Sequence, residues 1–172
     1  MRRLITLTIT MLALTGFMAI TALAQSPHYL HGTPTTNGID KNGDLQVNFT
    51  IAGLGNNVTI DMTVTADTTT TFLCQNKGGN CPNAANKLTV SGPETVHGLF
   101  TSGKNGSLSG ALTLQPGSPG DFKCPGGQNL ILGKVTYADV TITSSAALPI
   151  IHLGTFSFTA PNLGPDCLAQ LP

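Results

Sequence analysis

The feature that most constrains the fold is a series of short β-branched runs broken by turn residues. In Val58-Ile60-Met62-Val64 the apolar residues alternate with Thr and Asp, which places the two sets on opposite faces of an extended chain. Beyond the N-terminus no segment has a sustained 3.6-residue apolar period, so the sequence favours strands over helices. The pattern predicts strands at 45–51, 58–66, 69–74, 87–91, 95–100, 107–115, 130–144 and 152–160.

The interruptions between these runs have the composition of turns. Segments 40–44, 53–57 and 103–106 supply Gly and Asn, which tolerate positive φ. Asn105-Gly106, between two strand-like runs, predicts a hairpin.

The spacing of these strands predicts the fold class. At Val135 and Tyr137 the apolar residues of the 130–144 run fall on odd-numbered positions, whereas from Val140 they fall on even-numbered positions. This switch predicts a β-bulge near Ala138-Asp139. About eight short strands separated by turns predict an all-β protein, an antiparallel β-sandwich of Greek-key or immunoglobulin-like type. A closed barrel is the main alternative.

The first 24 residues have the pattern of a secretory signal peptide. Arg2 and Arg3 precede an apolar run, and Ala22-Leu23-Ala24 is a small-x-small cleavage site. The alternative is an uncleaved membrane anchor, but the polar Gln25 and the residues after it lack the basic flank of a stop-transfer segment. We expect residues 25–172 to be a single secreted domain, extracellular or periplasmic, with no membrane insertion after cleavage.

The charge of the predicted mature chain limits the classes of partner that it can bind. Without Arg2 and Arg3 it has six Lys against seven Asp and one Glu, a net charge near −2. A nucleic-acid-binding protein needs a basic face to offset phosphates, so the sequence predicts no nucleic-acid partner.

The four cysteines all lie in the exported part. An even count in an oxidising compartment predicts two disulfides among Cys74, Cys81, Cys124 and Cys167, with three possible pairings. The six residues between Cys74 and Cys81 exceed the usual zinc-ligand spacing. A Cys74–Cys124 bond would tie the long loops 75–86 and 116–128 to the sandwich, and Cys81–Cys167 would then hold the C-terminal tail.

Four Gly- and Asn-rich segments follow one another along this chain. They are GLGNN at 53–57, CQNKGGN at 74–80 continuing to NAANK at 83–87, FTSGKNG at 100–106 and CPGGQ at 124–128. In this order they resemble a group of uncharacterised bacterial secreted β proteins. The resemblance implies a small secreted protein of bacterial origin, in which Cys74 and Cys124 match the usual cysteine pair. It implies no activity.

Two patterns hint at metal binding. Residues 40–44 (DKNGD) match the start of an EF-hand loop, but Leu45 and Ile51 stand where its Gly and bidentate Glu belong, which favours a polar turn. His28 and His31 could share a copper or zinc ion if their segment were helical. A copper-dependent oxygenase would need His at the mature N-terminus, where cleavage leaves Gln25. We therefore predict no metal ligands and no cofactor.

The sequence gives little support for catalysis. A glycosidase needs two carboxylates in different environments, whereas this chain has Glu94 and scattered Asp residues. A Ser-His-Asp set assembled from separate strands stays open, with His97 and His152 on predicted strands. No catalytic residue is predicted, and the absence of Trp disfavours a flat aromatic platform for polysaccharide.

The sequence as a whole predicts a secreted non-catalytic surface, matrix or binding protein. Its expected partner is a glycan or a protein, bound through loops 75–86 and 116–128, since loops on a rigid scaffold commonly carry recognition. The alternative for these loops is a purely structural connection. The alternative function is a small secreted hydrolase or metal-dependent oxidase that uses His and Asp residues.

Overall fold

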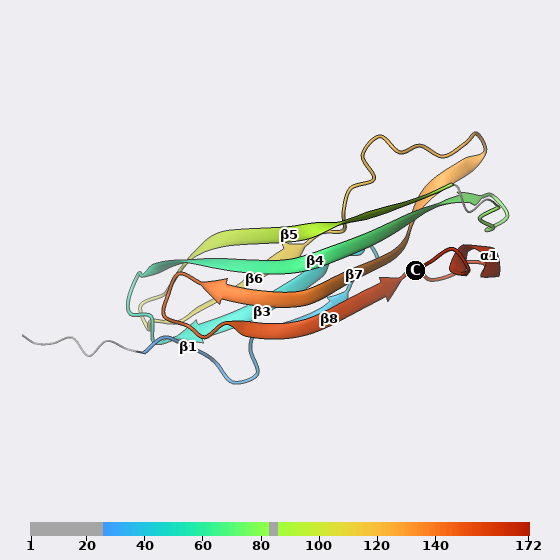
Figure 1. The fold of residues 1–172 in the computed structure, drawn as a ribbon. Coiled ribbons are helices and arrows are strands. Elements are labelled where there is room, and N and C mark those ends of the chain that lie inside the picture. The colour runs from blue at the N-terminus through green and yellow to red at the C-terminus, as the bar shows by residue number, and fades with distance from the viewer. Residues whose placement is uncertain (1–25, 83–85) are drawn as a thin grey trace, which may run out of the picture.

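Two antiparallel β-sheets pack face to face as a sandwich in the computed structural model (Figure 1), which describes residues 26–82 and 86–172. These residues form eight strands and a short helix. The predicted fold class is confirmed. The predicted signal peptide, residues 1–24, lies outside the described residues.

The first sheet is built on β3 (Leu45–Ala52). Along one edge of β3, β1 (His28–Tyr29) and β2 (Thr35–Ile39) follow each other end to end. Along the other edge lies β6 (Leu108–Leu114). Neither β1 nor β2 is predicted from the sequence, because neither has an alternating apolar pattern long enough to be recognised.

The second sheet has the order β5-β4-β7-β8 and much longer strands. They are β4 (Thr59–Asn76), β5 (Lys87–Thr101), β7 (Gln128–Ser144) and β8 (Ile151–Thr159). The expected strands 58–66 and 69–74 are one strand, as are 87–91 and 95–100. The ladder runs through the expected breaks, where Asp67 pairs with Pro93 and Thr68 with Gly92.

The connection order is a Greek key of immunoglobulin-like type. Strands β4 and β5 pair in one sheet, whereas β3 and β6, which flank them in the sequence, pair in the other. The hairpin predicted at Asn105-Gly106 is therefore wrong. Its turn exists, with the Gly106 N–H donating to the Gly103 carbonyl, but it carries the chain from one sheet to the other. Turn chemistry bends the chain locally, and the apolar faces decide the pairing.

The core between the sheets is made of inward-facing residues from both. Its buried members are Leu45, Val47, Phe49, Ile51, Ile60, Met62, Val64, Ala66, Leu108, Leu112, Leu114, Val135, Tyr137, Val140 and Ile142. Phe49 and Phe100 meet edge to face with ring centroids 4.9 Å apart. Gly110 makes room for them, because a Cβ there would lie 2.5 Å from the Phe100 ring and 2.9 Å from Phe49.

The predicted bulge in β7 is confirmed. The pairing of β7 with β8 shifts register between Tyr137 and Val140, and Asp139 has φ of 52°. The extra residue keeps Tyr137 and Val140 both in the core, although they are three positions apart.

Beyond the first sheet, β4, β5 and β7 continue into a separate end of the molecule (Figure 1). We call this the stapled end and define it as the described residues of 72–88, 116–134 and 160–172; the other described residues are the body. It includes α1 (Pro165–Leu168). Its buried cluster is Leu73, Cys81 and Cys167, with Ile131, Leu163 and Leu171 packed against it.

Candidate binding sites

The stapled end contains both loops that the sequence predicts to bind a partner. Disulfides join Cys74 to Cys124 and Cys81 to Cys167, which confirms the expected pairing. The first bond links the end of β4 to the 116–128 loop, and the second links the 75–86 loop to α1. Two disulfides fit an extracellular or otherwise oxidising environment.

Hydrogen bonds fix the loop that follows β4. The Asn76 side-chain oxygen accepts the backbone N–H groups of Gly78 and Asn80 at 2.9 and 3.0 Å. The Gln75 side-chain amide donates to the Gly79 carbonyl at 3.0 Å. The Asn76 contacts are of Asx type, and together with the Gln75 contact they order a Gly- and Asn-rich loop that has little apolar surface to bury.

The C-terminal segment is tied down by polar contacts to the same region. The Gln170 side chain donates to the Cys81 carbonyl at 2.6 Å, and Lys87 Nζ donates to the Gln170 carbonyl at 3.0 Å. Lys134 Nζ donates to the Pro172 carbonyl at 2.6 Å. The described parts of the two loops and the C-terminal segment are therefore held as one unit.

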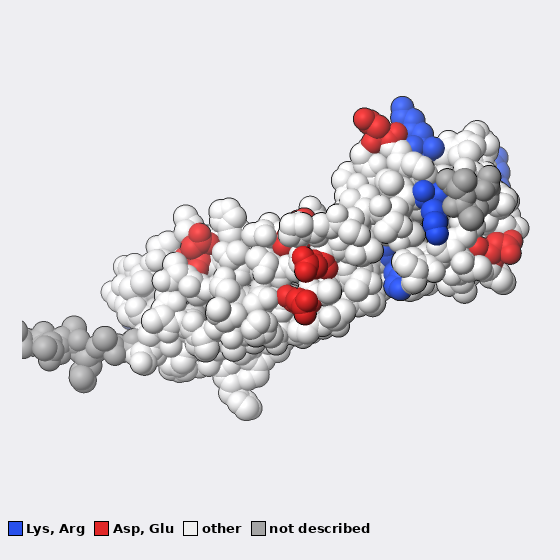
Figure 2. Space-filling view, viewed as in Figure 1, with Lys and Arg blue, Asp and Glu red and all other residues white. Residues whose placement is uncertain are grey.

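Charge is distributed unevenly between the two regions. The stapled end has Lys77, Lys87, Lys123 and Lys134 with two Asp, a net charge of +2, whereas the body has two Lys with five Asp and Glu94, a net charge of −4. Figure 2 shows the visible Lys side chains gathered at this end, although acidic side chains occur there too. Lys77 and Lys123 are exposed and form no ion pair with any described residue.

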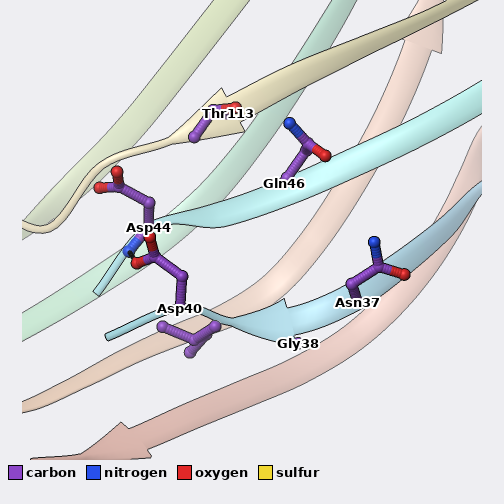
Figure 3. Close-up of a pocket in the computed structure, with 7 residues that line it drawn as sticks. Asn37, Gly38, Asp40, Asp44, Gln46 and Thr113 are labelled. Atoms are coloured by element: carbon purple, nitrogen blue, oxygen red, sulfur yellow. Dashed lines mark hydrogen bonds between the residues drawn. The ribbon is translucent and has the colours of Figure 1, made fainter. Parts of the chain in front are cut away.

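A polar groove of about 410 Å³ opens on the outer face of the first sheet. Figure 3 shows Asn37 of β2, Gln46 of β3 and Thr113 of β6 along it, with Asp40 and Asp44 at the turn that precedes β3. Gln46 pairs with Thr113 across the ladder, so the two side chains lie side by side on one face. On the β2 side, Gly38 (φ of 81°) lies in a register shift against β3.

The turn at the end of the groove is fixed from two sides. Asp40 Oδ1 accepts the N–H groups of Asn42 and Asp44, both at 2.8 Å. From the opposite sheet, the buried Tyr137 hydroxyl donates to the Gly43 carbonyl at 2.8 Å and lies 3.3 Å from that of Leu114. These contacts make segment 40–44 a hydrogen-bonded turn that leads into β3.

Burial raises the pKa of the Asp44 carboxyl, and the negative charge of the nearby Asp40 raises it further. Burial also raises the pKa of the Tyr137 phenol, and Asp44, Glu94 and Asp40 raise it further. At neutral pH the phenol thus keeps its proton, which it donates to the turn. Sequence reasoning missed the groove because β2 was not predicted and the register of β3 on β6 was unknown.

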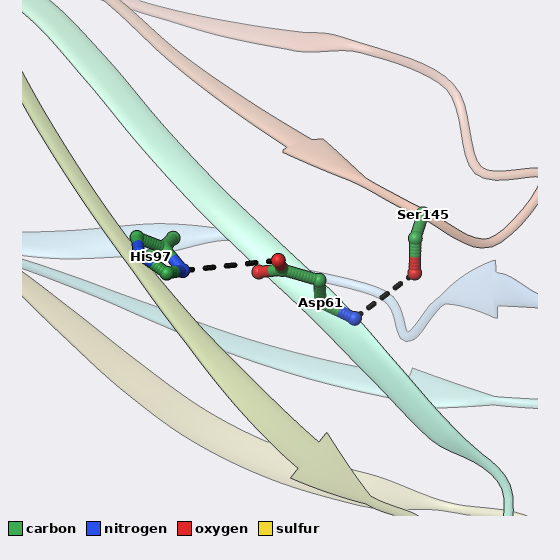
Figure 4. A network of polar contacts seen from close by, with 3 residues as sticks. All are labelled: Asp61, His97 and Ser145. Atoms are coloured by element: carbon green, nitrogen blue, oxygen red, sulfur yellow. Dashed lines mark hydrogen bonds and ion pairs between the residues drawn. The ribbon is translucent and has the colours of Figure 1, made fainter.

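The Ser, His and Asp residues that meet in space do not form a catalytic triad (Figure 4). His97 Nδ1 lies 3.7 Å from Asp61 Oδ2 across β5 and β4. Ser145 Oγ instead accepts the backbone N–H of Asp61 at 2.9 Å, on the other side of that residue from His97. A triad requires a hydrogen bond between the nucleophile and its base, and this arrangement has none.

The other candidate ligands remain apart. His28 lies in the extended β1 and its ring contacts the Ser26 carbonyl at 2.9 Å, so His28 and His31 do not share a helix face. His152 lies on β8. Among residues 26–82 and 86–172, no group of three or more His, Cys, Asp or Glu is placed to hold a metal ion. Within the same ranges, no helix has the length and apolarity to cross a membrane.

No protein-family model and no curated protein sequence matches this chain. Any functional assignment therefore depends on the geometry of the two regions described above.

Proposed function

We propose that this protein is a secreted, non-catalytic binding module of bacterial origin whose recognition surface is the stapled end. The observation that carries the proposal is the joining of both predicted recognition loops by two disulfides into one unit with exposed lysines. A loop surface held rigid before binding loses little entropy when the partner arrives.

The charge of the stapled end favours an acidic partner, and we propose an acidic polysaccharide. Lys77 and Lys123 are exposed, whereas Lys87 and Lys134 already donate to backbone carbonyls. Among the described residues, the first two therefore have all three ammonium donors available for carboxylate groups, whereas Lys87 and Lys134 each have one donor engaged. The net charge of the stapled end is only +2, so a single carboxylate would bind it weakly. A flexible polymer with repeated carboxylates would bind more tightly, because several weak contacts add along its chain.

Export is tested with the full chain. Expression with its N-terminus intact, followed by mass spectrometry of the secreted product, is expected to give Gln25 as the first residue. A product that keeps residues 1–24 would contradict the proposed signal peptide.

Binding is tested with that product on immobilised polygalacturonate, with the uncoated surface as the comparison. The double variant Lys77→Gln/Lys123→Gln is expected to bind polygalacturonate several-fold more weakly, and binding is expected to fall as salt screens the charges. The matched control is Lys41→Gln/Lys104→Gln, which removes two exposed lysines from the body. No binding to polygalacturonate, or equal losses in the two double variants, would contradict recognition by the stapled end.

A further inference from the structure

The groove on the first sheet has the chemistry of a ligand site that is separate from the stapled end. We propose that it binds a neutral polyhydroxylated ligand, one or two sugar units of an uncharged glycan. Its volume of about 410 Å³ lies within the range of roughly 300–1,000 Å³ that is typical of small-molecule sites.

Hydrogen-bonding groups with free capacity line this groove. Within the described part of the chain, the side chains of Asn37, Gln46 and Thr113 have no hydrogen-bond partner within the protein, and neither has the Asp44 carboxylate. An amide offers both donors and acceptors, a hydroxyl offers either, and a carboxylate accepts from two hydroxyls at once. Adjacent hydroxyl groups on a sugar ring present the complementary set.

The charge of the lining selects against other ligands. Asp40 and Asp44 contribute carboxylates, and none of the described residues that line the groove is Lys, Arg or His, so an anionic ligand would be repelled. A metal ion is also a poor fit. Asp40 Oδ1 is already engaged by two backbone N–H groups, and its Oδ2 lies 3.1 Å from the Asn42 side-chain nitrogen.

The groove is shaped before any ligand arrives. Tyr137 holds the turn from beneath through the Gly43 carbonyl, and Asp40 closes the turn from within. Gln46 and Thr113 are carried by paired strands, so their backbones cannot move independently. A preformed site of this kind avoids the entropic cost of ordering loops on binding.

The test is a two-dimensional amide NMR titration of the secreted protein with soluble neutral oligosaccharides of glucose, mannose and galactose. We expect at least one to shift the signals of Asn37, Gln46 and Thr113 selectively. Gln46→Ala is expected to weaken that binding about tenfold, since it removes a bidentate contact from an exposed position whose loss leaves the core intact. The matched control is Asn48→Ala, which removes an amide from the same strand and face outside the groove.

Several outcomes would overturn the proposal. These are no shifts in the groove with any neutral oligosaccharide, equal weakening by Gln46→Ala and Asn48→Ala, or selective shifts with calcium alone. The groove is tested independently of the stapled end. Neutral-sugar binding is expected to survive Lys77→Gln/Lys123→Gln, and polygalacturonate binding is expected to survive Gln46→Ala.

Discussion

The body and the stapled end are stabilised by different means. The body buries a cluster of fifteen apolar side chains between two sheets, whereas the cluster in the stapled end has three buried residues, two of them disulfide-bonded cysteines. A fully buried apolar side chain contributes about 1.5–3 kcal/mol, so the smaller cluster cannot by itself offset the entropy of ordering its loops. Covalent bonds supply the difference there, mainly by restricting the unfolded chain.

This contrast also separates the two proposed sites. The groove lies on a scaffold that apolar packing keeps in shape, and its polar side chains project from paired strands. The stapled end presents loop backbone and lysine side chains, and its shape depends on the two disulfides. The groove should therefore survive reduction of the disulfides, and the stapled-end surface should not.

The largest effect is expected from a cavity in the body. Phe49→Ala removes a fully buried ring and its contact with Phe100. We expect the free energy of unfolding to fall by about 3–5 kcal/mol, measured by urea denaturation followed by circular dichroism. A loss below about 1 kcal/mol would show that apolar packing is not what holds the body. Leu99→Ala, at a position 73% exposed on β5, is the control and should change stability little.

The next effect is expected from the disulfide that anchors the C-terminal segment. Cys81→Ser/Cys167→Ser opens a cross-link that spans 86 residues, for which we expect a cost of about 2–4 kcal/mol. The loss should be local, because the buried cluster of the body makes no use of this bond. Hydrogen exchange should thus rise in 160–172 before it rises in β3 and β6. Uniformly faster exchange in both regions would show that the two are one cooperative unit.

The smallest effect concerns the hydroxyl that joins the sheets beneath the groove. Tyr137→Phe leaves the ring in the core but removes the donor to the Gly43 carbonyl, with an expected cost of about 1–2 kcal/mol at neutral pH. The same variant should weaken oligosaccharide binding in the groove and leave polygalacturonate binding unchanged. Weaker polygalacturonate binding with unchanged oligosaccharide binding would show instead that Tyr137 supports the stapled end and not the groove.

Alkaline unfolding gives a second measure of Tyr137. Its pKa in the folded protein is raised above the ordinary value of 10.0, chiefly by burial, whereas the unfolded phenol ionises near that value. The unfolded chain therefore loses the proton first, and stability should fall as pH rises above about 10. In Tyr137→Phe this fall should be smaller. Denaturation at pH 7 and pH 11 measures the difference, and an equal fall in both proteins would contradict it.

The alternation of the 58–66 segment and the parity change in β7 were enough to predict an all-β sandwich and the bulge near Asp139. Both follow from the two-residue period of a strand, which depends only on local sequence. The pairing of cysteines was narrowed to one hypothesis among three, which the structure confirms. The strand breaks expected near Asp67 and Gly92 were wrong, because the long ladder of β4 with β5 overrides local turn preference.

The class of fold and the even number of cysteines available for disulfides can be predicted from the amino-acid sequence, because they depend on local periodicity and on composition. The three-dimensional fold is needed to show that Asn105-Gly106 turns between the two sheets and that Asn37, Gln46 and Thr113 line one groove. These residues come from three strands, of which β6 lies far along the chain from β2 and β3. Their proximity depends on register and on which faces are buried together, and no local pattern encodes that.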